Sequence, residues 1–119
     1  MVEKLPIIEA SIVIPTHNRA QILSECLQRL IDQDFPKDRY EIVIVDDGSK
    51  DNTKQVVEKI KKTSKVSINY LFQKTQGQGI ARNYGLRFAK GEIIIFIGDD
   101  ILVLNDFVKQ HLKFHHKYF

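Results

Sequence analysis

Two continuous apolar runs, each followed by an acidic pair, constrain the fold of this chain more than any other feature. Ile42 to Val45 leads into Asp46-Asp47, and Ile93 to Ile97 leads through Gly98 into Asp99-Asp100. Short runs that are apolar at every position, without polar alternation, are typical of strands buried on both faces of a parallel sheet. We therefore expect an α/β protein with a mostly parallel sheet flanked by helices.

The remaining segments supply the other elements of such a fold, because strands alternate with stretches of helical apolar spacing. The expected strands cover residues 11–15, 40–45, 67–73 and 92–97, and the expected helices cover 21–33, 52–63, 79–89 and 105–117. Gly91 is expected to follow the third helix as its C′ glycine. The last helix is expected to turn inward the side chains of Phe107, Val108, His111, Leu112 and Phe114.

Composition limits the class of protein. A chain of 119 residues forms at most one domain, and its longest apolar run is far shorter than the ~20 residues that span a bilayer. Met1 to Lys4 leads into the fold without the apolar region of a secretion signal. A cytoplasmic location is therefore expected, with peripheral attachment to a membrane left open. Cys26, the single cysteine, is expected to be a buried structural thiol on a helix.

Much of the +3 net charge lies on and just after the second expected helix. A nucleic-acid surface would also show interleaved aromatic residues or a known module, and the sequence has neither. We interpret this region as a solvated helix face and expect no nucleic-acid partner. Its lysines are Lys54, Lys59, Lys61, Lys62 and Lys65.

Polar segments follow the expected strands, and they are expected to meet in one crevice because parallel sheets bind ligands beyond the carboxyl ends of their strands. Pro15-Thr16-His17-Asn18-Arg19 follows the first strand. Its amide, imidazole, hydroxyl and guanidinium suit a nucleobase and a phosphate. The alternative is a plain turn in which Thr16 or Asn18 caps the next helix.

Asp46 and Asp47 follow the second strand. One carboxylate is expected to support the turn, and the other to accept a hydrogen bond from a ribose hydroxyl or a base N–H. Asp47 is the expected ligand contact. The alternative is an Asx-type turn capping the second helix, to which Ser49 and Asp51 also point.

The third expected helix opens with Gly77-Gln78-Gly79. Glycines before a helix N-terminus let a phosphate approach backbone N–H groups, and the helix dipole favours the negative charge. Arg82 and Asn83 in the first turn could reach a diphosphate. The alternative is a flexible loop with Arg82 in solvent. A dinucleotide-binding fingerprint is not present, because it needs a third glycine.

Gly98-Asp99-Asp100 follows the last strand. Adjacent carboxylates without Cys or His favour a hard cation such as Mg²⁺ or Mn²⁺ over zinc. Four carboxylates at one edge would also repel one another unless a cation or hydrogen-bond donors lay among them. The alternative is a solvated turn. The histidines of the last helix, His111, His115 and His116, are interpreted as surface or packing residues.

In order and spacing, four segments together closely resemble the family 2 glycosyltransferases with the GT-A fold. The segments are Ser-Ile-Val-Ile-Pro-Thr-His-Asn-Arg (11–19), Tyr-Glu-Ile-Val-Ile-Val-Asp-Asp-Gly-Ser (40–49), Gly-Ile-Ala-Arg-Asn-Tyr-Gly-Leu (79–86) and Gly-Glu-Ile-Ile-Ile-Phe-Ile-Gly-Asp-Asp (91–100). The resemblance implies a Rossmann-like half that binds a nucleotide sugar, with a UDP-sugar favoured, and Mn²⁺ or Mg²⁺. It implies sugar-nucleotide contacts from Pro15, Thr16, His17, Asn18, Arg19, Asp46, Asp47, Gly79, Arg82 and Asp99, and metal ligation by Asp100 and Asp99.

The chain departs from the family pattern in two respects. Gly98 stands where many members carry the first Asp of an Asp-x-Asp motif. Members also continue into an acceptor-binding region, which in inverting enzymes supplies the catalytic base, and no residue after Asp100 can be assigned that role. Residues 1–119 are therefore expected to form a single truncated nucleotide-sugar-binding domain. This domain is expected to be weakly active or inactive alone, and its acceptor, a glycan or a lipid-linked molecule, is not identified.

Three other classes compete with this interpretation. The main alternative is a non-catalytic nucleotide-binding or assembly module that forms a homo-oligomer through an exposed sheet edge or the last helix. A signalling receiver domain would place its acidic pair after the first strand, where this chain has Pro15 to Asn18. A nucleotidyltransferase would carry a Gly-rich loop with Arg or Lys at that position.

Overall fold

The computed structural model describes residues 7–118, with side chains described through residue 116. The strands are β1 (Ala10–Thr16), β2 (Tyr40–Asp47), β3 (Ser67–Gln73) and β4 (Ile93–Phe96), and the helices are α1 (Ala20–Ile31), α2 (Thr53–Thr63), α3 (Gln78–Phe88) and α4 (Phe107–Tyr118). The expectation drawn from Met1 to Lys4 lies outside the described residues.

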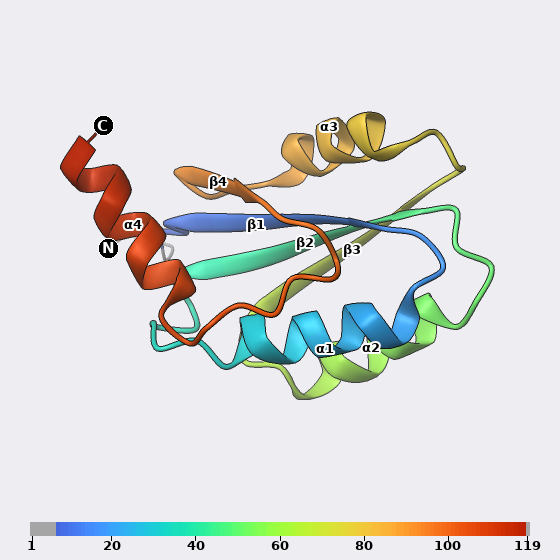
Figure 1. Ribbon diagram of the computed structural model, residues 1–119, viewed down its shortest axis with the longest axis horizontal. Helices are drawn as coiled ribbons and strands as arrows, with labels where there is room; N and C mark the ends of the chain where they lie inside the picture. The colour runs from blue at the N-terminus through green and yellow to red at the C-terminus, as the bar shows by residue number, and fades with distance from the viewer. Residues whose placement is uncertain (1–6, 119) are drawn as a thin grey trace, which may run out of the picture.

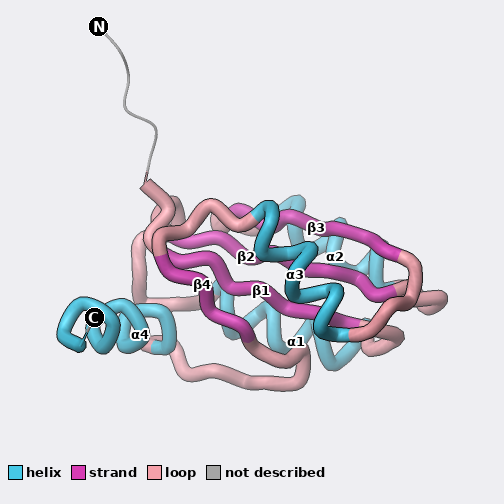
Figure 2. The backbone as a smooth tube through the Cα atoms, turned by 90° about the horizontal axis from the view of Figure 1, so that it is seen from above, coloured by secondary structure: helices cyan, strands magenta, loops and turns pink. Residues whose placement is uncertain are grey.

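The strands form one sheet in the order β3-β2-β1-β4, and every neighbouring pair is parallel. Helices α1 and α2 cover one face of the sheet and α3 lies on the other, whereas α4 lies beside the amino ends of the strands (Figures 1 and 2). This arrangement confirms the predicted α/β fold with a parallel sheet flanked by helices.

The main core lies between the sheet and the α1–α2 layer. Alternate residues of the two central strands, among them Ile12 and Ile44, are fully buried there against Leu23, Leu27 and Val57. Burying an aliphatic side chain of this size contributes about 1.5–3 kcal/mol. The continuous apolar runs thus hold the strands in place, and the carboxyl ends of the strands are positioned by the same packing.

Helix α3 packs on the opposite face through a glycine. A Cβ at Gly85 would lie 2.6 Å from Val13 Cγ1 and 3.0 Å from Val45 Cγ2. The helix can lie this close to β1 and β2 because residue 85 has no side chain. The N-terminal half of the helix, which carries Arg82, is thereby held at the carboxyl end of the sheet.

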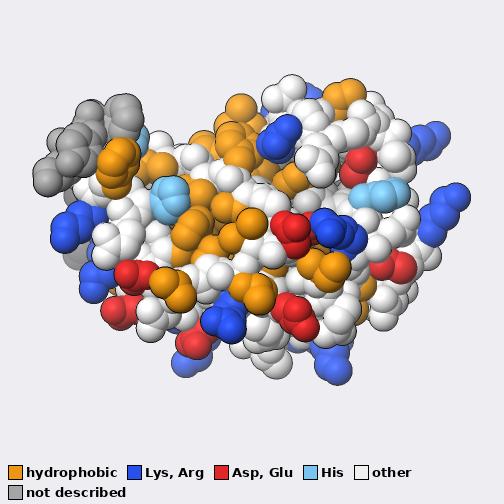
Figure 3. All heavy atoms as spheres, in the orientation of Figure 1, with side chains coloured by type: hydrophobic (Ala, Val, Ile, Leu, Met, Phe, Trp, Pro, Cys, Tyr) orange, Lys and Arg blue, Asp and Glu red, His pale blue; other side chains and the backbone are white. Residues whose placement is uncertain are grey.

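The segment from residue 97 to residue 106 runs back from β4 to α4 and is tied to the end of α1. Helix α1 ends two residues earlier than expected, and Gln33 beyond it is buried. The Gln33 amide donates to the Leu104 carbonyl at 2.7 Å and accepts from the Val108 N–H at 2.9 Å. Hydrophobic side chains gather on the face that this segment crosses (Figure 3), including exposed Ile101 and Leu102.

Two expectations about local structure are wrong. Gly91 is not a C′ glycine, because Gly48 and Gly77 are the glycines with positive φ within residues 7–118. Residue 91 instead has no room for a side chain, since a Cβ would lie 2.5 Å from the Ser11 nitrogen. In α4, His111 and Phe114 are exposed and do not point inward.

Helix α4 contacts the body of the protein through fewer residues than expected. Val108 and Leu112 are buried and Phe107 is partly buried in the main core. None of the helices formed by residues 7–118 is long and apolar enough to cross a membrane.

Candidate functional site

The carboxyl ends of β1, β2 and β4 border a crevice made of two adjoining hollows of about 320 and 210 Å³. Both hollows are lined by Pro15, Arg19, Gln78 and Asp99. The larger one is completed by Arg82, Phe96, Ile97, Gly98 and Asp100, and the smaller one by Thr16, His17 and Asp47. The polar segments predicted from sequence therefore meet in one place.

A wider hollow of about 820 Å³ lies at the opposite, amino ends of the strands. Its lining includes the exposed Lys61, Lys65 and Lys90 and no residue of the four polar segments that follow the strands. Because ligands of parallel α/β sheets bind at the carboxyl ends of the strands, the two smaller hollows form the candidate site.

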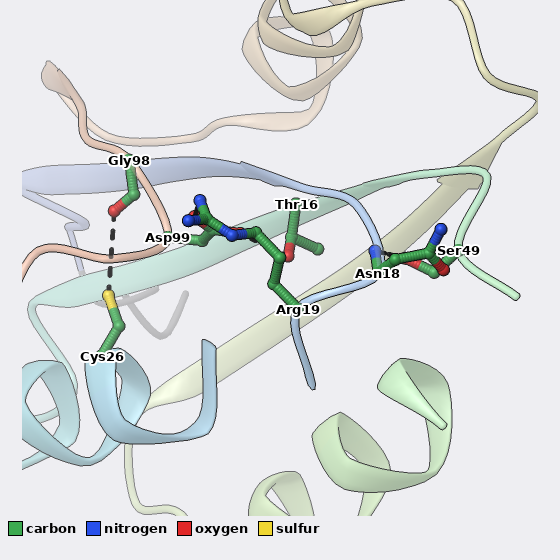
Figure 4. Close-up of polar contacts among 7 residues, drawn as sticks. All are labelled: Thr16, Asn18, Arg19, Cys26, Ser49, Gly98 and Asp99. Carbon is green, nitrogen blue, oxygen red and sulfur yellow. Dashed lines mark hydrogen bonds and ion pairs between the residues drawn. The ribbon is translucent and has the colours of Figure 1, made fainter. Parts of the chain in front are cut away.

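Asp99 is the buried acid at the centre of the crevice, with 4% of its surface exposed. Its carboxylate accepts hydrogen bonds from Thr16 Oγ1 at 2.9 Å and from Arg19 Nη1 at 2.8 Å. Figure 4 shows the Arg19 side chain reaching from the start of α1 to Asp99. Three residues that were each predicted to contact a nucleotide sugar are thus joined to one another through Asp99.

Asp100 differs from its neighbour. It is exposed at the larger hollow, and its carboxylate forms no hydrogen bond with any other described residue. Within the described part of the chain, no group of three or more His, Cys, Asp or Glu side chains could hold a metal ion. Mg²⁺ commonly takes one or two carboxylates and completes its shell with water and substrate phosphate. The residues present therefore fit a cation shared with a bound phosphate, and they do not fit an all-protein metal centre.

Asp46 and Asp47 are the last two residues of β2, whereas the sequence predicted that they begin a loop. The strand is longer because Asp46 pairs with Thr16 and Asp47 with Gln73 in the sheet registers. The Asp46 carboxylate accepts hydrogen bonds from the Ser49 N–H at 2.8 Å and from the Tyr70 hydroxyl. It therefore supports the turn, as one of the two acids was expected to do.

The Asp47 carboxylate is also held by the protein. It accepts hydrogen bonds from Gln73 Nε2 at 2.8 Å and from the backbone N–H groups of Gln76 at 2.8 Å and Gly77 at 3.0 Å. Burial acts to raise the pKa of Asp47, but these hydrogen bonds outweigh it and hold the pKa below its ordinary value. Asp47 lines the smaller hollow and at the same time fixes the loop ahead of α3.

Asn18 joins the loop after β1 to the loop after β2. Its φ of 51° lies in the left-handed region, which Asn adopts more readily than most residues. Its side-chain oxygen accepts from the Lys50 N–H at 2.7 Å, and its own N–H donates to Ser49 Oγ at 2.8 Å (Figure 4). The side-chain oxygen of Asn18, predicted to contact a nucleoside, is thus engaged by the protein.

One acid, Asp51, accepts hydrogen bonds from the first N–H groups of both α1 and α2. Neither Thr16 nor Asn18 caps α1; Asp51 accepts a hydrogen bond from the Ala20 N–H at 3.2 Å. Asp51 also accepts from the Thr53 N–H at 3.1 Å at the start of α2. Of the two residues predicted to cap α2, Ser49 and Asp51, it is Asp51 that contacts the start of the helix, whereas Ser49 Oγ accepts from the Asn18 N–H. The contact of Asp51 with α1 was not foreseen because 31 residues separate the two partners.

His17 has both ring nitrogens engaged. Nδ1 lies 2.6 Å from the Asp47 carbonyl oxygen and donates to it, and Nε2 accepts from Asn18 Nδ2 at 3.1 Å. This pairing assigns the proton to Nδ1 and fixes the plane of the ring. The ring face, not a ring nitrogen, is then left to contact a ligand in the smaller hollow.

At the start of α3, the structure brings Gln78 and Arg82 to the site but leaves Gly79 out of its lining. Gly77 precedes the helix with a φ of 99°, a conformation that favours glycine. Gly79 is exposed, and a Cβ there would contact nothing within 4 Å. Gln78 was not singled out from sequence, although its position as the first helical residue after a glycine is a usable signal.

Cys26 lies beneath the site as a structural thiol, as predicted. It is fully buried, and its Sγ is 4.0 Å from the Gly98 carbonyl oxygen (Figure 4). Burial, followed by the charges of Asp99 and Asp100, raises the pKa of the thiol to about 11. The protonated thiol is a poor nucleophile at neutral pH.

Comparison with known proteins agrees with this geometry. Residues 11–118 match the family described as Glycosyl transferase family 2. The poly(ribitol-phosphate) beta-N-acetylglucosaminyltransferase TarS of Staphylococcus aureus strain Mu50 is 36% identical over 104 residues, which are 87% of this chain and 18% of the relative. Glycosyltransferase AglE of Haloferax volcanii is 34% identical over 101 residues, 84% of this chain and 32% of the relative.

Solved structures show the same similarity. The crystal structure of S. aureus TarS 1-349 in complex with UDP-GlcNAc superposes with a TM-score of 0.85 at 34% identity, covering 93% of this chain and 32% of that one. The mannosyltransferase PcManGT from Pyrobaculum calidifontis in complex with GDP-Man and Mn²⁺ gives a TM-score of 0.85 at 29% identity, covering 90% and 32%.

The parallel sheet, with its crevice at the carboxyl ends of the strands, is thus the α/β fold of the GT-A glycosyltransferases. The chain belongs to glycosyl transferase family 2, as the sequence resemblance predicted. It spans from about a fifth to a third of the length of these relatives.

Proposed function

We propose that this domain binds a UDP-sugar together with Mn²⁺ or Mg²⁺ and serves as the sugar-donor-binding part of a glycosyltransferase. The observation that carries the proposal is the Asp100 carboxylate at the larger hollow, which has no hydrogen-bond partner among the described residues and which shares the hollow with Arg82. A carboxylate and a guanidinium at one hollow suit a metal-bound diphosphate, because one ligates the cation and the other pairs with phosphate oxygens. The TarS complex with UDP-GlcNAc and the PcManGT complex with GDP-Man and Mn²⁺ support this assignment.

The nucleoside is assigned to the smaller hollow. The ring face of His17 and the backbone at Pro15 and Thr16 border this space, and the Asp47 carboxylate closes it. The diphosphate would cross Arg19 and Asp99 to reach Arg82 in the larger hollow, where the sugar also lies. Asn18 and Asp46 act on the ligand indirectly, because their hydrogen bonds hold the loops that form the crevice.

In the proposed reaction, the bond from the anomeric carbon to the diphosphate oxygen breaks while a bond to the acceptor oxygen forms. The acceptor proton passes to a base, and inversion at the anomeric carbon follows from a single displacement. A bound divalent cation would supply charge stabilisation to the leaving diphosphate. Arg82, which lines the larger hollow from α3, would place a second positive charge beside the leaving diphosphate.

The base is not assigned to any described residue. The carboxylates that line the two hollows are those of Asp47, Asp99 and Asp100, and each is assigned to holding the protein or the cation. We therefore propose that the 119 residues by themselves bind the sugar donor but transfer the sugar slowly.

A second candidate is a non-catalytic assembly module that forms a homo-oligomer. The observation that favours it is the edge of β4 that does not pair with β1. Exposed apolar side chains lie on this strand, at Phe96 (44% exposed), and in the segment that follows it, at Leu104 (72% exposed). Sedimentation analysis that shows a dimer in the absence of nucleotide would support this candidate.

The first experiment is calorimetric titration of UDP into the chain with and without Mn²⁺. We expect Mn²⁺-dependent binding that is lost in Asp100→Ala and retained in the matched control Asp38→Ala, because Asp38 is an exposed acid distant from the crevice. Binding of equal strength in the wild type and Asp100→Ala would contradict the assigned cation ligand. Absence of UDP binding under both conditions would contradict the proposed function.

A further inference from the structure

The Arg19–Asp99 ion pair lies where the two hollows adjoin, because both residues line both of them. On one side of the pair is the smaller hollow with His17, and on the other is the larger hollow with Asp100. A ligand that occupies both hollows passes across this pair. The pair is therefore placed to act on the nucleotide and on a cation at the same time.

Both oxygens of the Asp99 carboxylate are already used. Oδ1 accepts from Arg19 Nη1 at 2.8 Å, and Oδ2 accepts from Thr16 Oγ1 at 2.9 Å. The Asp99 side chain is 6% exposed and that of Arg19 is 44% exposed, so solvent screens this pair less than an exposed pair. A buried carboxylate needs such partners, and here the protein supplies them in place of a cation.

A cation at the site therefore starts with one available carboxylate, that of Asp100. A single carboxylate is a weak site for a hard divalent cation in water, because the cation must give up hydration for few new ligands. The guanidinium of Arg19 adds repulsion from the neighbouring position. A diphosphate would remove both obstacles to cation binding. Its oxygens add ligands for the cation, and its negative charge offsets the repulsion from Arg19.

We propose that Arg19 is a positioning residue that withholds Asp99 from divalent cations, so that the crevice binds a cation tightly when a nucleoside diphosphate is bound with it. The inference rests on the proposed function, because it concerns the same nucleotide site. Coupling between two ligands is reciprocal. The nucleotide strengthens cation binding by the same factor by which the cation strengthens nucleotide binding.

The test is calorimetric titration of Mn²⁺ alone into the full chain, its Arg19→Ala variant and the matched control Arg29→Ala. Arg29 is an exposed arginine near the other end of the same helix. We expect the Mn²⁺ affinity to rise about tenfold or more in Arg19→Ala, because Asp99 is released as a second ligand and a nearby positive charge is removed. Arg29→Ala should match the wild type.

A second variant tests whether the gain in Mn²⁺ affinity depends on the Asp99 carboxylate. Adding Asp99→Asn to Arg19→Ala should cancel the gain in Mn²⁺ affinity if the freed Asp99 carboxylate is the new ligand. Arg19→Gln, a smaller change for the fold, should also raise the affinity. Circular dichroism melting checks that each variant is folded. Unchanged or weaker Mn²⁺ binding in both folded Arg19 variants would overturn the proposal.

Repeating the titrations with UDP present measures the coupling. In the wild type, UDP should raise the Mn²⁺ affinity strongly, and in Arg19→Ala by a smaller factor. If UDP fails to bind the wild type at all, the proposed function and the nucleotide dependence fail together. If UDP binds normally and Arg19→Ala leaves the Mn²⁺ affinity unchanged, only the proposed role of Arg19 is refuted, and the proposed function stands.

Discussion

The two acidic pairs look alike in the sequence, but the structure uses them differently. Both carboxylates of Asp46-Asp47 are enclosed by hydrogen bonds from β3 and from the loops that follow the strands. In the second pair, Asp99 is enclosed in the same way and Asp100 is not. Three of the four acids are thus held by hydrogen bonds from the protein, and Asp100 is the acid that we propose for contact with a ligand. An acid at a strand end is a ligand candidate when the protein leaves its oxygens unpaired.

The largest effect expected from this comparison is the loss of stability in Asp47→Ala. Removing the carboxylate leaves three donors without a partner, on Gln73, Gln76 and Gly77. An unsatisfied buried group costs about 1–3 kcal/mol, and we expect a total of about 3–5 kcal/mol because the loop groups regain some hydration. Urea unfolding measures this loss. A loss below about 1 kcal/mol would show that Asp47 is not a structural acid.

A smaller loss of stability is expected when one hydrogen-bond donor to the Asp46-Asp47 pair is removed. Tyr70→Phe deletes the hydroxyl that donates to Asp46 and leaves one buried carboxylate oxygen without that bond. We expect the free energy of unfolding to fall by about 1–3 kcal/mol. Tyr84→Phe is the matched control, since Tyr84 lies on α3 outside this network.

The pH dependence of stability gives a second test of the structural role of Asp47. Because the folded pKa of Asp47 lies below its ordinary value, the unfolded chain takes up a proton at higher pH than the folded chain does. The contribution of Asp47 is therefore fully present above about pH 4 and is lost as the pH falls through its folded pKa. Asp47→Asn should flatten the acid side of the stability curve measured by urea unfolding between pH 6 and 3. Asp51, whose pKa is lowered chiefly by the Thr53 hydroxyl, retains its own acid dependence in both proteins.

The smallest change in stability is expected for the acid that is left free. Asp100→Ala removes an exposed carboxylate without a hydrogen bond to the described chain, so the free energy of unfolding should change by less than about 0.5 kcal/mol. Thermal unfolding without metal checks this. A loss as large as that of Asp47→Ala would erase the distinction between the two pairs.

The sequence predicted the elements well because each depends on local patterns. Strands such as β2 and helices such as α2 follow from apolar continuity and apolar spacing. The limits of β2 were missed because Asp46 and Asp47 look like loop residues, and their place in the sheet depends on partners in other strands. The inward direction of His111 in α4 was also wrong, because the helix is docked through few residues at the edge of the core.

Most of the predicted site residues line one crevice, whereas Asn18, Asp46 and Gly79 do not. The contacts among the predicted site residues could not be read from the sequence. Arg19 and Asp99 lie 80 residues apart, and Asn18 and Lys50 lie 32 apart. Spacing indicates which edge of the sheet a residue reaches, and it does not indicate which oxygen is already paired. Which of the four acids hold the protein together, and which one has its oxygens available, depends on that pairing.

Gly85 affects the crevice through the position of α3, because the N-terminal part of this helix borders the crevice. Arg82 is one turn away on the same helix, so the clearance between the helix and the valines behind it sets how far the guanidinium stands above the sheet. A single methyl group at residue 85 would push the helix away from the sheet and move the Arg82 charge away from the path that we propose for the diphosphate. The depth of the site thus depends on Val13 and Val45, which are fully buried and do not line either hollow.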